Sequence, residues 1–151
     1  DFMSFSSQFI SMSCGLIKLG DLFELYRENR NLPQVKSFNE ELNQFFYADI
    51  QEISCHKDPC KKINTSKDCI IVPVNSSLLA ARGWKNAEKI NQNDILVVDY
   101  GHNGVEWSVA ECAATSCLPD KMTCFNLVLR RASNFVISSH YHGAGFIIKS
   151  S

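Results

Sequence analysis

The stretch from Cys69 to Val98, CIIVPVNSSLLAARGWKNAEKINQNDILVV, decides the fold class of this chain. It opens with an apolar run at 70–74, which meets the polar turn Asn75-Ser76-Ser77. Two leucines follow, then a tight Arg82-Gly83 turn and a β-rich run at 95–98. Short apolar runs bounded by turn residues are typical of β-strands, so this block predicts three strands joined by tight turns.

The rest of the chain continues this alternation of short apolar runs and turns. A hairpin is predicted over 9–22, followed by a short helix at 22–27 with Asp21 as its N-cap, and 37–43 is acidic and weakly helical. Further strands are predicted at 45–53, 105–109, 125–130, 134–138 and 146–149, with a turn at 101–104 and exposed loops at 54–67 and 113–121. The pattern indicates an all-β fold with one or two short helices, in a single domain over 1–151.

Composition excludes several classes of function. The net charge of −1 gives no electrostatic footprint for nucleic acid. No window reaches eighteen apolar residues, so we expect no membrane span, and the start of the chain has no basic and apolar signal-peptide pattern. No cofactor motif is present, and we expect a monomer without cofactor or metal.

Seven cysteines are many for a chain of 151 residues. Two pairs share one spacing, Cys55-x4-Cys60 and Cys112-x4-Cys117, and two glycosylation sequons begin at Asn64 and Asn75. These features slightly favour a secreted protein with up to three disulfides, in which Cys55 bridges Cys60 or the two pair with Cys112 and Cys117. Free buried cysteines that pack as small hydrophobic residues are the alternative.

The block at 69–98 resembles the middle of the Hint fold, which inteins and hedgehog autoprocessing domains share. The positions in register with that pattern are Gly83, Trp84, Ala87, Ile90, Asp94, Val97 and Val98. The catalytic pair departs from it, because Pro73 stands where the family has Thr and Ser76 where it has His. The resemblance implies a Hint-like horseshoe of curved strands, with Val97 and Val98 in a long strand after a Gly83-Trp84 turn.

The two ends of the chain resemble the outer blocks of the same family. Residues 124–129 and 133–136 resemble the two strands before the last one, and 145–151 has the shape of the final intein strand. Lys149 stands where the family has His, and Ser150 where it has the cyclising Asn. At the start, Leu19-Gly20-Asp21-Leu22 closes a hairpin like the first Hint block, and Ser4-Phe5 is the nearest match to the nucleophile and the residue after it.

The resemblance implies self-cleavage, through a shift of the chain from nitrogen to oxygen or sulfur, with the flanking polypeptide in cis as the partner. Such chemistry needs a nucleophile, an acid for the departing amine and an oxyanion stabiliser. The candidate catalytic residues are Ser4, Ser76, His140, His142, Ser150 and Ser151, where the two histidines could replace the missing imidazole. Ser4 and Ser151 are expected within about 20 Å of each other. A dozen residues of extended strand would span about twice that distance.

Three other interpretations stay open from the residues alone. The chain could be a non-catalytic, secreted, disulfide-braced module that binds another protein. It could also be a cysteine hydrolase that uses Cys14 with His140 or His142. Finally, Cys55, His56 and Cys60 could form a zinc site, although their spacing differs from the usual zinc pairs.

Overall fold

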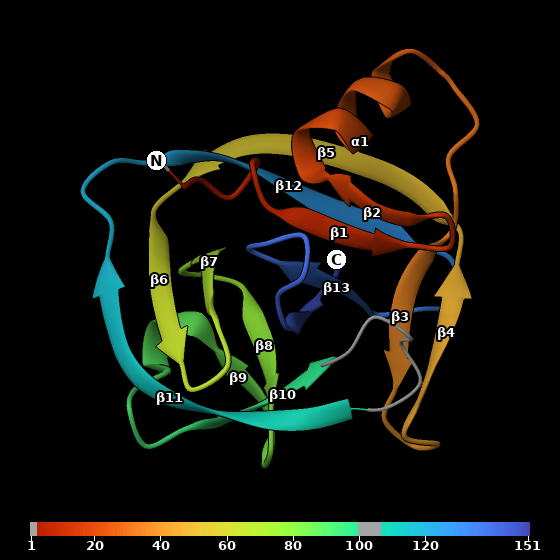
Figure 1. The fold of residues 1–151 in the computed structure, drawn as a ribbon. Helices are drawn as coiled ribbons and strands as arrows, with labels where there is room; N and C mark the ends of the chain where they lie inside the picture. The colour runs from red at the N-terminus through yellow and green to blue at the C-terminus, as the bar shows by residue number, and fades with distance from the viewer. Residues whose placement is uncertain (1–2, 100–106) are drawn as a thin grey trace.

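The computed structural model describes residues 3–99 and 107–151, and over these residues the protein is all-β (Figure 1). One α-helix, α1 (Leu19–Arg27), and one 3₁₀ helix, η1 (Ala87–Lys89), accompany the strands in the described part. The strands are β1 (Phe9–Met12), β2 (Gly15–Lys18), β3 (Val35–Asn39), β4 (Gln44–Ala48), β5 (Ile50–Asp58), β6 (Cys60–Thr65), β7 (Cys69–Pro73), β8 (Ser77–Ala80), β9 (Gly83–Asn86), β10 (Ile95–Asp99), β11 (Trp107–Cys117), β12 (Met122–Leu129), β13 (Asn134–Ser138) and β14 (Gly145–Lys149).

Most of the described strands belong to one curved, antiparallel sheet that does not close. Its order is β4-β3-β1-β13-β14-β8-β10-β11-β6-β7, with β2 on β1 and β9 on β8, while β5 and β12 form a separate ribbon. In Figure 1 the long strands β5, β6, β11 and β12 run around the outside, and β7, β8 and β13 lie within that frame. Strands from the two ends of the chain are neighbours, because β1 pairs with β13.

The block that decided the fold class contains the three predicted strands as β7, β8 and β10, and it adds a fourth strand, β9, and the helix η1. β8 and β9 form a hairpin in which Ala80 pairs with Gly83, and Gly83 adopts a φ of 115° that favours glycine. Trp84 follows in β9, and Val97 and Val98 lie in β10. The predicted turn at 101–104 and the ends of the two predicted strands beside it lie outside the described residues.

The helix begins earlier than predicted. Lys18, rather than Asp21, is the N-cap of α1, and its side chain makes no capping hydrogen bond. Asp21 instead lies in the first turn, where a negative charge interacts favourably with the helix dipole. Over the described residues, no helix is long and apolar enough to span a membrane.

Three segments predicted to be loop or weak helix are wrong, because all three contribute strands. Residues 37–43 form the end of β3 and its turn into β4, residues 54–67 form most of β5 and β6, and β11 continues to Cys117. In the β5–β12 ribbon, β12 is largely buried whereas β5 is mostly exposed, so the polar residues of β5 suit a strand that faces water and show no apolar alternation.

The core lies on both faces of the inner strands. A large cluster includes Phe5, Phe135, Phe146 and Ile148, and a smaller cluster on the opposite side includes Ile147. Because neighbouring residues of a strand point to opposite faces, β14 is covered on both sides. The two faces together hold the C-terminal strand in the middle of the molecule.

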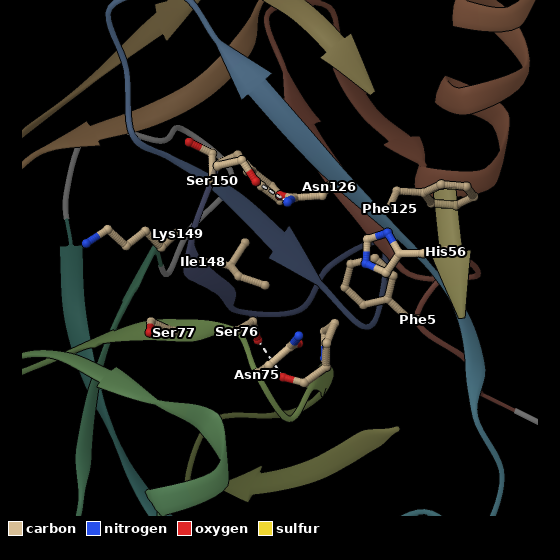
Figure 2. A pocket seen from close by; sticks show the side chains of 13 residues that line it. Phe5, His56, Asn75, Ser76, Ser77, Phe125, Asn126, Ile148, Lys149 and Ser150 are labelled. Carbon is tan, nitrogen blue, oxygen red and sulfur yellow. Dashed lines mark hydrogen bonds between the residues drawn. The ribbon is translucent and has the colours of Figure 1, made fainter. Parts of the chain in front are cut away.

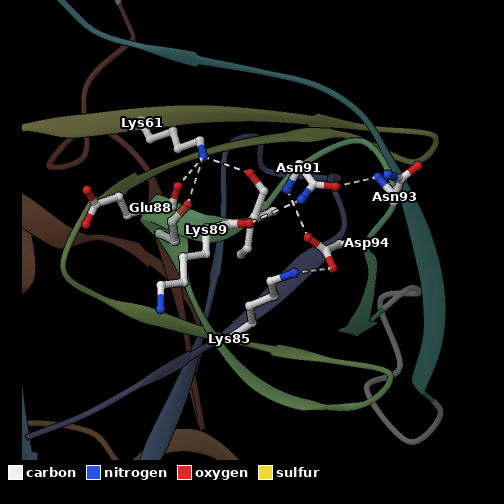
Figure 3. Close-up of polar contacts among 9 residues, drawn as sticks. Lys61, Lys85, Glu88, Lys89, Asn91, Asn93 and Asp94 are labelled. Atoms are coloured by element: carbon white, nitrogen blue, oxygen red, sulfur yellow. Dashed lines mark hydrogen bonds and ion pairs between the residues drawn. The ribbon is translucent and has the colours of Figure 1, made fainter.

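A network of polar contacts fixes the segment between β9 and β10 (Figure 3). Lys61 is buried and its Nζ donates to the carbonyls of Ala87, Glu88 and Ile90 at 3.0, 3.2 and 2.7 Å. Partial burial raises the pKa of Asp94, but hydrogen bonds from the Lys85 ammonium and a backbone N–H outweigh it and hold that pKa below its usual range. These contacts therefore hold the polar segment 87–94, between β9 and β10, in place.

Candidate functional site

A pocket of about 230 Å³ lies between the end of β7, the middle of β12 and the end of β14 (Figure 2). Three of the six candidate residues line it, namely Ser76, Ser150 and Ser151. Phe5 lines it as well, so the first and last described segments of the chain meet there. This arrangement agrees with the expected proximity of Ser4 and Ser151.

Ser76 belongs to the turn between β7 and β8. Its backbone N–H and its hydroxyl both donate to the Pro73 carbonyl, at 3.1 and 2.6 Å. The Ser76 carbonyl accepts a hydrogen bond from the Ala87 N–H at 2.8 Å, which ties the turn to η1. Ser76 therefore closes a rigid turn, and its hydroxyl has no proton-donating strength comparable to that of an imidazolium.

The last two residues complete the pocket wall. The N–H groups of Ser150 and Ser151 donate to the carbonyls of Ser133 and Leu127 at 2.8 and 3.1 Å. The Ser151 hydroxyl contacts the side-chain amide of Asn126, and the buried Ser150 hydroxyl has no hydrogen-bond partner among the described residues. A buried, unpartnered hydroxyl in a pocket is a group to which a further polar group could bind.

Ser4 lies immediately before the pocket-lining Phe5 and does not line the pocket itself. Its N–H donates to the Ser7 hydroxyl at 3.0 Å, and its own hydroxyl accepts from the Ser7 N–H at 3.3 Å. The Ser7 hydroxyl in turn donates to the Ser4 carbonyl at 3.0 Å. These three hydrogen bonds hold Ser4 in a compact turn.

Gln8 anchors the N-terminal turn to β7. Its side chain is fully buried, and its amide pairs with the backbone of Ile71 as a neighbouring strand would. The Gln8 Nε2 donates to the Ile71 carbonyl and the Ile71 N–H donates to Oε1, both at 2.8 Å. Ser4 is therefore held at a fixed place beside the strand that leads to Ser76.

His56 on β5 supplies an imidazole to the pocket. It lines the pocket, and Figure 2 shows it beside Phe5 and Phe125. Its Nε2 lies 2.6 Å from the Asp58 carboxylate, whose side chain is 18% exposed. The short contact pairs the imidazole with a carboxylate two residues further along β5.

The two predicted histidines lie elsewhere. His140 follows β13, and its Nε2 is 3.2 Å from the Asp68 carboxylate. His142 packs against the Tyr141 ring in the turn between β13 and β14. Neither residue lines the pocket, so the turn that carries them brings no imidazole to the site.

Cys14 makes no recorded contact with either of its predicted histidine partners, His140 and His142. It is exposed in the turn between β1 and β2. Phe9, at the other end of β1, packs on Tyr141 in the histidine-bearing turn. Cys14 lies in the turn beyond the opposite end of β1, and the three steps from Phe9 to Met12 alone span about 10 Å. The arrangement gives no support to that interpretation.

The seven cysteines are free in the structure. Cys60 does not contact Cys55 but lies 3.4 Å from Cys124, Sγ to Sγ, and both are buried. The hydrogen bond with Cys60 and burial raise the pKa of Cys124, and burial raises that of Cys112 to about 11. Within the described residues, Cys55, His56 and Cys60 are also not gathered as metal ligands.

Sequence reasoning missed two residues of the pocket, His56 and Asn126. His56 lies in a segment that was expected to be a loop, and only its pairing opposite Cys124 in the β5–β12 ribbon brings it to the site. The sequence marked His56 only as a possible zinc ligand with Cys55 and Cys60, and the period-2 signal of β5 is too weak to place it at this pocket. Asn126 lies in the strand that was identified, yet the partner of its amide, Ser151, is distant in sequence.

No protein-family model and no curated protein sequence matches the chain. Among solved structures, the DnaB intein from Synechocystis sp. PCC 6803 is 16% identical, with a TM-score of 0.78 over 99% of this chain and 97% of the intein. The DnaX mini-intein from Spirulina platensis is 15% identical, with a TM-score of 0.75 over 97% and 98%. An intein from a hyperthermophile is 16% identical, with a TM-score of 0.80 over 98% and 99%. The chain therefore has the Hint fold of inteins over nearly its whole length, as predicted.

Proposed function

We propose that this chain is an intein-like autoprocessing domain that cleaves itself before Ser4 and does not splice. One observation carries the proposal: Phe5 and Ser151, from the two ends of a Hint fold, line one pocket together with Ser76. A fold that brings both chain ends to one site suits a reaction on its own flanking segments.

In the proposed reaction the Ser4 hydroxyl attacks the carbonyl carbon of Met3. The bond between that carbon and the Ser4 nitrogen breaks, and an ester forms between Met3 and the Ser4 oxygen. The hydroxyl loses its proton to solvent as the oxygen attacks, and the nitrogen leaves as an amine and takes up a proton from an acid, so no net proton is consumed. Water or another nucleophile then cleaves the ester and releases the segment that ends at Met3.

His56 is the proposed acid. It lines the pocket, whereas His140 and His142 do not, and its Nε2 lies 2.6 Å from the Asp58 carboxylate. Ser76 stands where the family has its imidazole and is committed to the Pro73 carbonyl. The site would thus keep its acid on β5 instead of on the turn after β7.

The C-terminal step is absent from the proposed function. Cyclisation at the end of an intein needs a side-chain amide, and Ser150 has none. The amide of Asn126 contacts Ser151, but it belongs to another strand, so cyclisation there would cleave the wrong peptide bond. Cleavage before Ser4 is therefore the single reaction proposed.

Incubation with hydroxylamine, followed by intact-mass measurement, tests the proposal. Hydroxylamine traps an ester, so the chain should lose the segment through Met3 as a hydroxamate. Ser4→Ala should abolish the loss, and His56→Gln should slow it by about 10²–10⁴, the usual contribution of one general acid. No spliced product should form when folded domains are attached at both ends.

His142→Gln separates the two possible sources of the imidazole. If His142→Gln stops cleavage and His56→Gln does not, the proposed acid is wrong. A chain that keeps its full mass in hydroxylamine, with its fold intact, would favour the non-catalytic binding module. The two variants distinguish a slow reaction from none: Ser4→Ala should show no mass loss, and His56→Gln should show a slow mass loss.

A further inference from the structure

A second cluster of reactive side chains lies outside the pocket, where two turns meet. Asp68 lies in the turn between β6 and β7, Cys69 begins β7, and His140 lies in the turn between β13 and β14. One carboxylate oxygen, one Sγ and one imidazole nitrogen of these residues all lie within 4.8 Å of one another. None of the three lines the pocket of the proposed reaction.

We propose that Asp68, Cys69 and His140 bind a divalent zinc-type cation, which joins the two turns. Thiolate, imidazole and carboxylate are the ligands that zinc takes in proteins, and three of them leave a fourth position for water. Zinc ligands lie about 2.0–2.3 Å from the ion, so two of them are about 3.3 Å apart at a tetrahedral angle. Asp68 Oδ1 and His140 Nε2 are 3.2 Å apart, which matches that spacing.

The turn that carries Asp68 and Cys69 is held rigidly. The Thr65 hydroxyl donates to the Asp68 carbonyl at 2.6 Å and accepts from the N–H groups of Lys67 and Asp68 at 3.2 and 3.1 Å. The Cys69 N–H donates to Asp68 Oδ1 at 2.9 Å, which orients the carboxylate. The ligands of the first turn are therefore placed before an ion binds, which lowers the cost of binding.

The second turn packs closely on the carboxylate. The Ser139 hydroxyl donates to Asp68 Oδ1 at 3.3 Å, a contact of the kind that orients metal ligands. A Cβ at Gly143 would lie 2.2 Å from Asp68 Oδ2, so an added methyl group would require the Asp68 carboxylate to shift. When the ion binds, it replaces the direct contact between His140 and Asp68, and the thiol proton of Cys69 passes to solvent.

Cobalt titration of the intact chain in chelator-free buffer tests the site. Co²⁺ should give a thiolate-to-metal charge-transfer band that Zn²⁺ removes by competition, and Zn²⁺ should raise the thermal midpoint. Cys69→Ser should remove the band, and His140→Gln should weaken Zn²⁺ binding by at least about tenfold, the scale on which loss of a metal-site partner acts. Cys55→Ser should leave both readouts unchanged.

Gly143→Ala probes the geometry while all three ligands remain. It should displace the carboxylate and weaken Zn²⁺ binding, whereas Gly20→Ala, whose added Cβ would meet its nearest atom at 3.5 Å, should not. Absence of the band in the wild-type chain, or its persistence in Cys69→Ser, overturns the proposal. Loss of the band in Cys55→Ser would move the site to Cys55, His56 and Cys60.

Discussion

At the scale of single residues, Gln8 shows how a buried polar side chain can position a reactive one. Its side-chain amide makes hydrogen bonds to both the carbonyl and the N–H of Ile71. These two bonds fix the N-terminal turn to β7, although the turn itself is not a β-strand. Sequence patterns gave no reason to place Gln8 in the core, because glutamine is usually exposed. The partner lies 63 positions away, and such contacts are invisible in a local pattern.

Gln8→Leu should destabilise the protein strongly. Leucine fills a similar volume but leaves the N–H and carbonyl of Ile71 buried without partners, at about 1–3 kcal/mol for each group. Urea unfolding measures the loss, and Gln34→Leu, at an exposed glutamine that contacts Asp49, is the matched control. Equal stability of the two variants would mean that the Gln8 contacts contribute nothing.

At the scale of the elements, the sequence predicts the apolar strands well and the polar ones badly. β7, β10 and β13 are nearly fully buried, so their apolar runs reveal them. β5 is mostly exposed, and its stability comes from pairing with β12 instead of from its own residues. His56 lies on β5, so the error about the strand is also the reason why the pocket imidazole was missed.

The cysteines should react according to the elements that carry them. Iodoacetamide should label Cys14, Cys55 and Cys117, which are exposed, and spare the buried Cys60, Cys112 and Cys124. Cys112 should be unreactive for two reasons: its side chain is buried, and a pKa of about 11 leaves little thiolate at neutral pH. Mass spectrometry of the labelled peptides reads the pattern, and a peptide with a Cys55–Cys60 disulfide would instead support the secreted, disulfide-braced alternative.

At the scale of the whole molecule, the C-terminal strand is the centre of the fold. β14 contacts β13, β8 and β10, and its residues face two separate apolar clusters. A half-buried strand would show alternation of buried and exposed residues, but here four successive residues of β14 are buried. The sequence could mark the strand as buried but could not say what covers each face.

Ile147→Ala and Ile148→Ala should therefore cost similar amounts. Each side chain is buried in a different cluster, so each truncation should leave a cavity and cost about 2–5 kcal/mol. Guanidinium unfolding of the two variants beside the parent chain gives the comparison. A change of less than about 0.5 kcal/mol for Ile147→Ala, as at a surface position, would show that the smaller cluster is not a true core.

Under the proposed intein-like function, the convergence of Phe5 and Ser151 on one pocket also has a consequence for the protein that hosts the domain. A guest whose entry and exit points are close together behaves, for the host, like an insertion in a surface loop. The host then has only a short gap to bridge, and the entropy cost of a closed loop grows slowly with its length. A host could therefore fold around the guest with little change in its own stability, whether or not the guest ever cuts itself free.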